Sequence, residues 1–133
     1  MKRLLIIASL ACISLLLTLQ ICSGEGYPIN SLAGSWRVIQ IFENGQEAQI
    51  NTSAQISVSG NVIYLEWWWY NGSGMQLNGS LDGLNLQGGG TATSCCPPSG
   101  MNARFQGQLS PDGRAIDLSI YYATISDRYR LLR

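Results

Sequence analysis

No histidine occurs in the 133 residues, so the chemistry open to this chain rests on carboxylates, tyrosines and cysteines. Histidine is the commonest general base near neutral pH and the commonest metal ligand, and its absence excludes Ser-His-Asp, Cys-His and histidine–metal mechanisms. The carboxylates are scattered, and Asp82 and Asp112 stand in turn sequences, where the backbone favours aspartate. We therefore predict no catalytic residue, no metal site and no cofactor. A hydrolase would need two facing carboxylates, such as Glu43 and Glu66 on neighbouring strands, and is a minor alternative.

Two adjacent cysteines form the second group with chemical potential. Cys95 and Cys96 precede Pro97 and Pro98. In an oxidising compartment such cysteines pair with each other, pair with another cysteine or stay free. A bond between neighbours closes a strained eight-membered ring, and strained disulfides are labile or stiffen a loop. We predict a possible vicinal disulfide between Cys95 and Cys96, with Cys22 as the alternative partner if it is retained without a lipid.

Three consecutive tryptophans and a tyrosine, Trp67 to Tyr70, make the most unusual stretch. Side chains alternate between the two faces of a strand, so Trp67 and Trp69 share one face and Trp68 and Tyr70 share the other. The first face is wholly apolar and is expected to point inward, either as packing or as the lining of a cup for a small molecule. The second face is expected to be exposed, as a contact patch for a partner, a sugar ring or a membrane interface.

These residues are set in a series of short predicted strands separated by turn residues. Strands are expected near residues 35–43, 54–59, 62–70, 75–81, 84–87, 103–109, 116–121 and 129–133. Residues 88–102 are expected to form a loop because they are too rich in glycine and proline for a central strand, and Asp127 is expected to interrupt a strand. Turns at intervals of about 8–12 residues are typical of a sandwich or barrel. Because closure removes exposed strand edges, we predict an all-β fold, a small antiparallel up-and-down barrel of about seven or eight strands whose last strand pairs with the first.

The start of the first predicted strand resembles the opening of lipocalin-like (calycin) barrels. Gly34-Ser35-Trp36 matches the Gly-x-Trp with which such barrels begin strand one. The resemblance implies a small secreted β-barrel in which Trp36 plugs the floor and an arginine near the chain end stacks on it. Arg128 and Arg130 are the candidates for that arginine. The resemblance supports the barrel and does not name a ligand.

The first 24 residues have the pattern of a secretory signal peptide, expected to form a signal helix ahead of the barrel. Lys2 and Arg3 precede an uncharged apolar run over residues 4–19, and small residues follow. We predict cleavage after Gly24. The mature domain then comprises residues 25–133.

Cys22 offers an alternative to simple cleavage, because a bacterial lipoprotein could carry a lipid on this cysteine. We expect an exported protein, periplasmic or extracellular, and associated with the outer membrane if Cys22 is lipidated. Without residues 1–24 the chain keeps six basic and eight acidic residues, so its net charge is −2. The lack of a basic patch predicts no binding to nucleic acid, and membrane contact only through the signal or a lipid anchor.

Two functions are compatible with these residues. The first is a non-enzymatic binding module for a small hydrophobic or amphipathic ligand, with Trp36, Trp67 and Trp69 lining or flooring its cavity. The second is a structural or protein-interaction domain of the cell envelope that contacts a partner through Trp68 and Tyr70. We expect the first.

Overall fold

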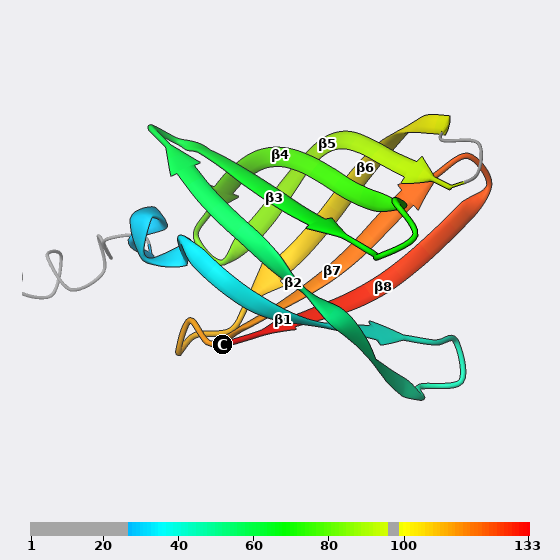
Figure 1. Ribbon diagram of the computed structural model, residues 1–133. Coiled ribbons are helices and arrows are strands. Elements are labelled where there is room, and N and C mark those ends of the chain that lie inside the picture. Colours follow the sequence, from blue (N-terminus) through cyan, green and yellow to red (C-terminus); the bar gives the residue numbers. More distant parts are fainter. Residues whose placement is uncertain (1–26, 96–98) are drawn as a thin grey trace, which may run out of the picture.

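Eight antiparallel strands form a closed barrel in the computed structural model (Figure 1). The structure describes residues 27–95 and 99–133. A short 3-10 helix η1 (Ile29–Leu32) precedes strands β1 (Gly34–Ile41), β2 (Glu47–Ser59), β3 (Val62–Trp68), β4 (Gly74–Asp82), β5 (Asn85–Ser94), β6 (Ser99–Leu109), β7 (Ala115–Tyr122) and β8 (Ile125–Leu132). Each strand pairs with the next, and β8 pairs with β1. The predicted all-β up-and-down barrel, closed between its last and first strands, is confirmed.

The predicted signal peptide and Cys22 lie outside the described residues, so cleavage and lipidation remain predictions. In the described part of the chain, no helix is long and apolar enough to cross a membrane.

The two ends of the barrel differ in how they are covered. The closed end, as we call it, holds η1 and the turns that join β2 to β3, β4 to β5 and β6 to β7 (Figure 1). Leu32 of η1 is fully buried there, and the Nε1 of Trp36 donates a hydrogen bond to its carbonyl oxygen at 2.9 Å. The opposite end, the mouth, is surrounded by the connections β1–β2, β3–β4 and β7–β8, together with the end of β5 and the start of β6.

An arginine does lie on the Trp36 ring, but it is Arg133. Its guanidinium carbon is 4.6 Å from the ring centre, and Nη2 donates to the carbonyl oxygen of Ala33 at 2.7 Å. The proposal of Arg128 or Arg130 was therefore wrong. Strand alternation explains the error, because both side chains belong to the outward-facing set of β8. Arg133 follows the strand, where the chain can turn across the floor.

The expected loop over 88–102 is also wrong, because β5 extends to Ser94 and β6 begins at Ser99. The glycines of β5 mark a close approach of two backbones, a recognised use of glycine in strands. A Cβ atom added to Gly88 would stand 2.0 Å from the carbonyl oxygen of Asn78 on β4. Only glycine allows β5 to lie this close to β4.

Inward-facing side chains from all eight strands form a single core. Trp36, Trp67 and Phe105 are its largest members, each 2% exposed or less. The Phe105 ring fills space beside the glycines, since a Cβ on Gly79 would stand 2.8 Å from its Cζ. The part of the barrel toward the closed end is therefore a packed core. Open space for a ligand lies at the mouth or on the outer wall.

Candidate functional site

A pocket of about 320 Å³ opens at the mouth of the barrel. Its lining comes from the β3–β4 connection and from the mouth ends of β4 to β8: Trp69, Asn71, Ser73, Gly74, Met75, Ala92, Thr93, Ser94, Met101, Tyr122 and Tyr129. Two thioethers and three aromatic rings converge here from five separate chain segments. Such surfaces adapt to apolar molecules because methionine is flexible and polarisable.

Trp69 belongs to a cluster of aromatic rings that extends from the pocket into the core. Its ring centre is 6.3 Å from that of Trp67, and the Trp67 ring is 5.3 Å from that of Tyr129, both in edge-to-face geometry. These distances fall in the range that aromatic pairs prefer. Trp67 is 1% exposed, and its Nε1 has no hydrogen-bond partner among the described residues. A buried donor without a partner costs free energy of folding. The cluster is therefore apolar except for one polar atom whose hydrogen bond is not made.

A carboxylate lies beside this pocket, on the inner face of β8. Asp127 was expected to interrupt a strand, and that expectation was wrong: it occupies the third position of β8 and shares the inner face with Tyr129 and Leu131. Tyr122, its near neighbour across the β7–β8 hairpin, donates a hydrogen bond to Oδ2 of Asp127. The hydroxyl of Tyr129 lies 3.5 Å from the same oxygen. These hydroxyls allow a polar side chain to occupy the interior face of the strand.

Both tyrosines keep their protons at neutral pH. Burial, followed by the neighbouring Asp127, raises the pKa of the Tyr122 hydroxyl far above its ordinary value. The same two causes raise the pKa of Tyr129. The hydroxyls are therefore neutral donors toward the carboxylate.

The structure brings together two of the three tryptophans proposed to hold a ligand. Trp69 lines the pocket and Trp67 packs directly behind it. Trp36 is not part of the pocket lining, because it is sealed into the closed end by Leu32 and Arg133. Sequence reasoning missed Tyr122, Asp127 and the two methionines. The spacing of Asp127, Tyr129 and Leu131 by two residues was the signal for one inward face.

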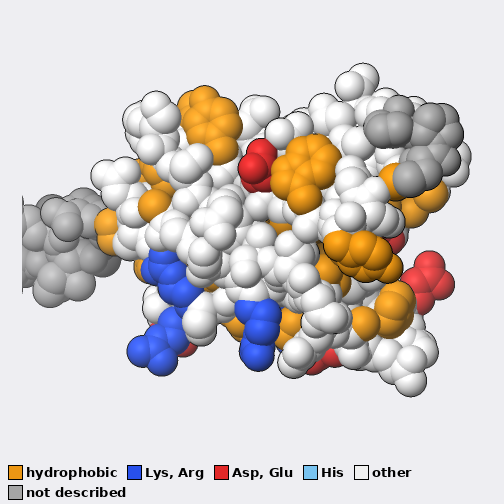
Figure 2. All heavy atoms as spheres, in the orientation of Figure 1, with side chains coloured by type: hydrophobic (Ala, Val, Ile, Leu, Met, Phe, Trp, Pro, Cys, Tyr) orange, Lys and Arg blue, Asp and Glu red, His pale blue; other side chains and the backbone are white. Residues whose placement is uncertain are grey.

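Trp68 and Tyr70, proposed as an interaction patch, point away from the core. Trp68 is 38% exposed, and Tyr70 is fully exposed beyond the end of β3. Tyr64 lies on the same outer face and is 45% exposed. Figure 2 shows hydrophobic side chains on the side of the barrel that β3 crosses, with uncharged polar surface and an acidic side chain between them. The alternation expected for this strand is confirmed, whereas contact with a partner remains a prediction.

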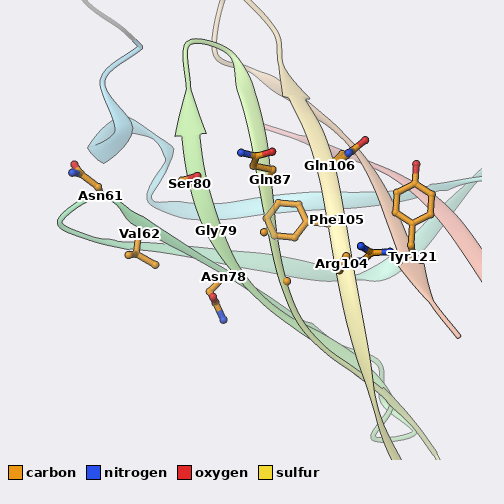
Figure 3. Close-up of a pocket in the computed structure, with 12 residues that line it drawn as sticks. Asn61, Val62, Asn78, Gly79, Ser80, Gln87, Arg104, Phe105, Gln106 and Tyr121 are labelled. Atoms are coloured by element: carbon orange, nitrogen blue, oxygen red, sulfur yellow. The ribbon is translucent and has the colours of Figure 1, made fainter.

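A larger hollow of about 880 Å³ lies on the outer wall over β4, β5 and β6 (Figure 3). It is bordered by polar side chains, including Asn78, Gln87, Arg104 and Gln106, with Phe105 beneath. Gly88 and Gly89 contribute only backbone to its lining, because they carry no side chains. The border groups are exposed to water and already hydrated, so this hollow is a weaker candidate than the aromatic pocket at the mouth.

Cys95 stands at the mouth, directly after β5, and is disulfide-bonded. Cys96 lies outside the described residues, so the vicinal pairing of Cys95 with Cys96 remains a prediction. Among residues 27–95 and 99–133, no three cysteine, aspartate or glutamate side chains come together in a way that could hold a metal ion.

No protein-family model, curated protein or solved structure matches the chain. The closed barrel of eight antiparallel strands supports the resemblance to lipocalin-like barrels at the level of architecture.

Proposed function

We propose that this barrel is a non-enzymatic binding module that holds a small amphipathic molecule in the pocket at its mouth. The observation that carries the proposal is the convergence of Trp69, Met75 and Met101 with Tyr122, whose hydroxyl donates to the adjacent Asp127. Ligand sites are usually concave and mostly apolar, with a few placed polar groups that fix orientation. At about 320 Å³ the pocket falls within the lower part of the roughly 300–1,000 Å³ range of such sites.

The polar groups in the lining support an amphipathic ligand over a purely apolar one. The hydroxyls of Tyr122 and Tyr129 lie in the same wall as Trp69 and the two methionines. A ligand with an apolar body would bury the rings and thioethers, and a polar end would meet the hydroxyls. A wholly apolar ligand would cover polar groups without replacing their contacts with water, which costs free energy.

Replacing Trp69 by alanine is expected to weaken binding of the neutral dye N-phenyl-1-naphthylamine about tenfold, because the change removes one aromatic wall of the pocket. The measurement is a fluorescence titration of the purified mature protein. Trp68→Ala is the matched control, since it removes the same side chain from the adjacent position on the outer face and should leave the affinity unchanged. Equal affinities for the two variants would place the dye elsewhere.

The exposed aromatic side chains of β3 favour a second candidate function, contact with an envelope protein. Tyr64 and Trp68 lie on the outer face of β3 and Tyr70 is exposed just beyond its end. Large aromatics that are exposed together often mark interaction sites. This role does not require the mouth pocket, so the two functions can be tested separately.

The double change Trp68→Ala/Tyr70→Ala is expected to remove the partners that the wild-type protein retains from an envelope extract. The comparison is a parallel pull-down analysed by mass spectrometry, with Trp69→Ala as the control that spares the outer face. Identical partner profiles for the wild type and the double variant would rule out the patch.

A further inference from the structure

We propose that the ligand of the mouth pocket is an organic cation, a primary alkylammonium whose chain lies against the apolar wall and whose nitrogen faces Tyr122 and Asp127. This inference rests on the proposed function and adds the charge and the polar chemistry of the ligand. It follows from the hydrogen-bonding capacity of the polar groups, from the charge of the mouth and from the nature of its walls.

The Tyr122–Asp127 pair beside the pocket is left with acceptor capacity only. A tyrosine hydroxyl has one proton, and Tyr122 donates it to Oδ2 of Asp127. The phenolic oxygen of Tyr122 can therefore only accept from a further group. Oδ1 of Asp127 accepts no hydrogen bond from any described residue, and a carboxylate has no proton to give. A ligand group that faces this pair has to supply N–H or O–H donors.

Among the described residues, no arginine forms an ion pair with Asp127. The ion pairs in the described part of the chain join Arg130 to Asp117 and to Glu47, and all three of these residues lie on the outer wall. Arg128 and Arg130 flank Asp127 in sequence but point to the opposite face of β8. A partly buried carboxylate without a counter-charge attracts a cation more strongly than an exposed one, because water screens it less. Ammonium satisfies both this charge and the need for donors.

The remaining wall of the pocket suits a cation that carries a hydrocarbon chain. Trp69 and Tyr129 present aromatic rings, which attract cations through their faces. Met75, Ala92 and Met101 provide the apolar contacts for a short chain. A carboxylate or phosphate placed beside this pair would meet the charge of Asp127, and the Tyr122 proton that could offset it is already donated to Asp127.

The test compares three probes of equal chain length: n-octylammonium, n-octanol and octanoate. We expect isothermal titration calorimetry of the oxidised mature protein at neutral pH to show octylammonium binding about tenfold more tightly than octanol, with octanoate weakest, because hydrogen bonds to a charged group contribute more than neutral ones. The change Asp127→Asn keeps the shape and an acceptor for Tyr122 while removing the charge. It is expected to lower the octylammonium affinity about tenfold and to leave octanol unchanged.

Asp82→Asn is the matched control, because it makes the same change in net charge at the exposed closed end of β4 and should leave all three affinities unchanged. If octanol or octanoate binds the wild type as tightly as octylammonium, or if Asp127→Asn leaves octylammonium binding intact, the cation proposal is overturned. If the dye binds in a Trp69-dependent way and no charge preference appears, only this inference fails. If neither the dye nor any of the three probes binds, the proposed function fails with it. The wild-type probe series decides the question even if Asp127→Asn does not fold.

Discussion

Replacing Gly88 by alanine is expected to lower the free energy of unfolding by at least about 3 kcal/mol, the upper end of what overpacking ordinarily costs. The added methyl carbon would stand 2.0 Å from the carbonyl oxygen of Asn78 and 2.6 Å from the Cα of Gly79. Both obstructing atoms belong to the backbone of β4, so no side-chain rotation can relieve the contact. The two strands would have to separate at the centre of the barrel.

Gly89→Ala is the control for this prediction, because it adds the same methyl group one residue further along β5, on the outer face. Its nearest neighbour would be the carbonyl oxygen of Ala103 at 3.1 Å, which a small backbone shift can accommodate. Urea denaturation followed by tryptophan fluorescence measures both variants, and the Gly88 change should lower the midpoint by about 1 M or more. Equal midpoints for the two variants would mean that β4 and β5 are not this close in solution.

Trp36→Ala is expected to cost about 3–5 kcal/mol, the usual loss when a large aromatic side chain is removed from a core. The substitution removes a side chain that is 1% exposed, the hydrogen bond from its Nε1 to Leu32, and the surface on which Arg133 lies. Because Leu32 is itself buried against this end, we expect η1 to detach and the closed end to open. The loss should appear in the urea midpoint and as faster hydrogen exchange at residues 29–33.

Arg133→Ala separates the role of the ring from that of the cation above it. A cation–π contact contributes about 0.5–1 kcal/mol at an exposed site, so this variant should lose far less stability than Trp36→Ala. Arg128→Ala, on the outer face of β8, should leave the midpoint unchanged. A loss for Arg128→Ala as large as that for Arg133→Ala would contradict the placement of Arg133 on the floor.

Much of the barrel follows from short-range signals. The alternation of Ile63, Leu65 and Trp67 with polar residues predicts which face of β3 is buried, and the burial of these three side chains agrees. The turn around Asp112 is supported by local hydrogen bonds, with Ser110 donating to its carboxylate and the amide of Arg114 donating to the same oxygen. The residues that make such contacts are only a few positions apart, so the sequence alone is enough to predict them.

The errors occur where the deciding contact is remote in sequence. Gly88 to Gly90 were predicted to be loop residues. The close approach of their backbone to β4 depends on residues 76–79, which are distant in the pattern that predicts strands. Asp127 is an exception, because its partner Tyr122 is only five residues away; it was predicted to interrupt a strand because the hydrogen bond between them depends on the register of the β7–β8 hairpin. The 320 Å³ pocket combines residues from 69 to 129, so its lining required the register of five strands, β4 to β8. Trp69 alone could be proposed, from the alternation that continues past the end of β3.

The chain enters and leaves the barrel at the same end. Tyr27 lies against Gly113 in the β6–β7 turn, and Arg133 lies across the floor on Trp36, while the mouth opens at the opposite pole (Figure 1). Any anchor upstream of residue 27 and any fusion after residue 133 therefore starts from the closed end of the barrel. A protein coupled to a surface through either terminus would present its mouth to the solution, so a biosensor chip or a membrane tether would leave the binding pocket accessible.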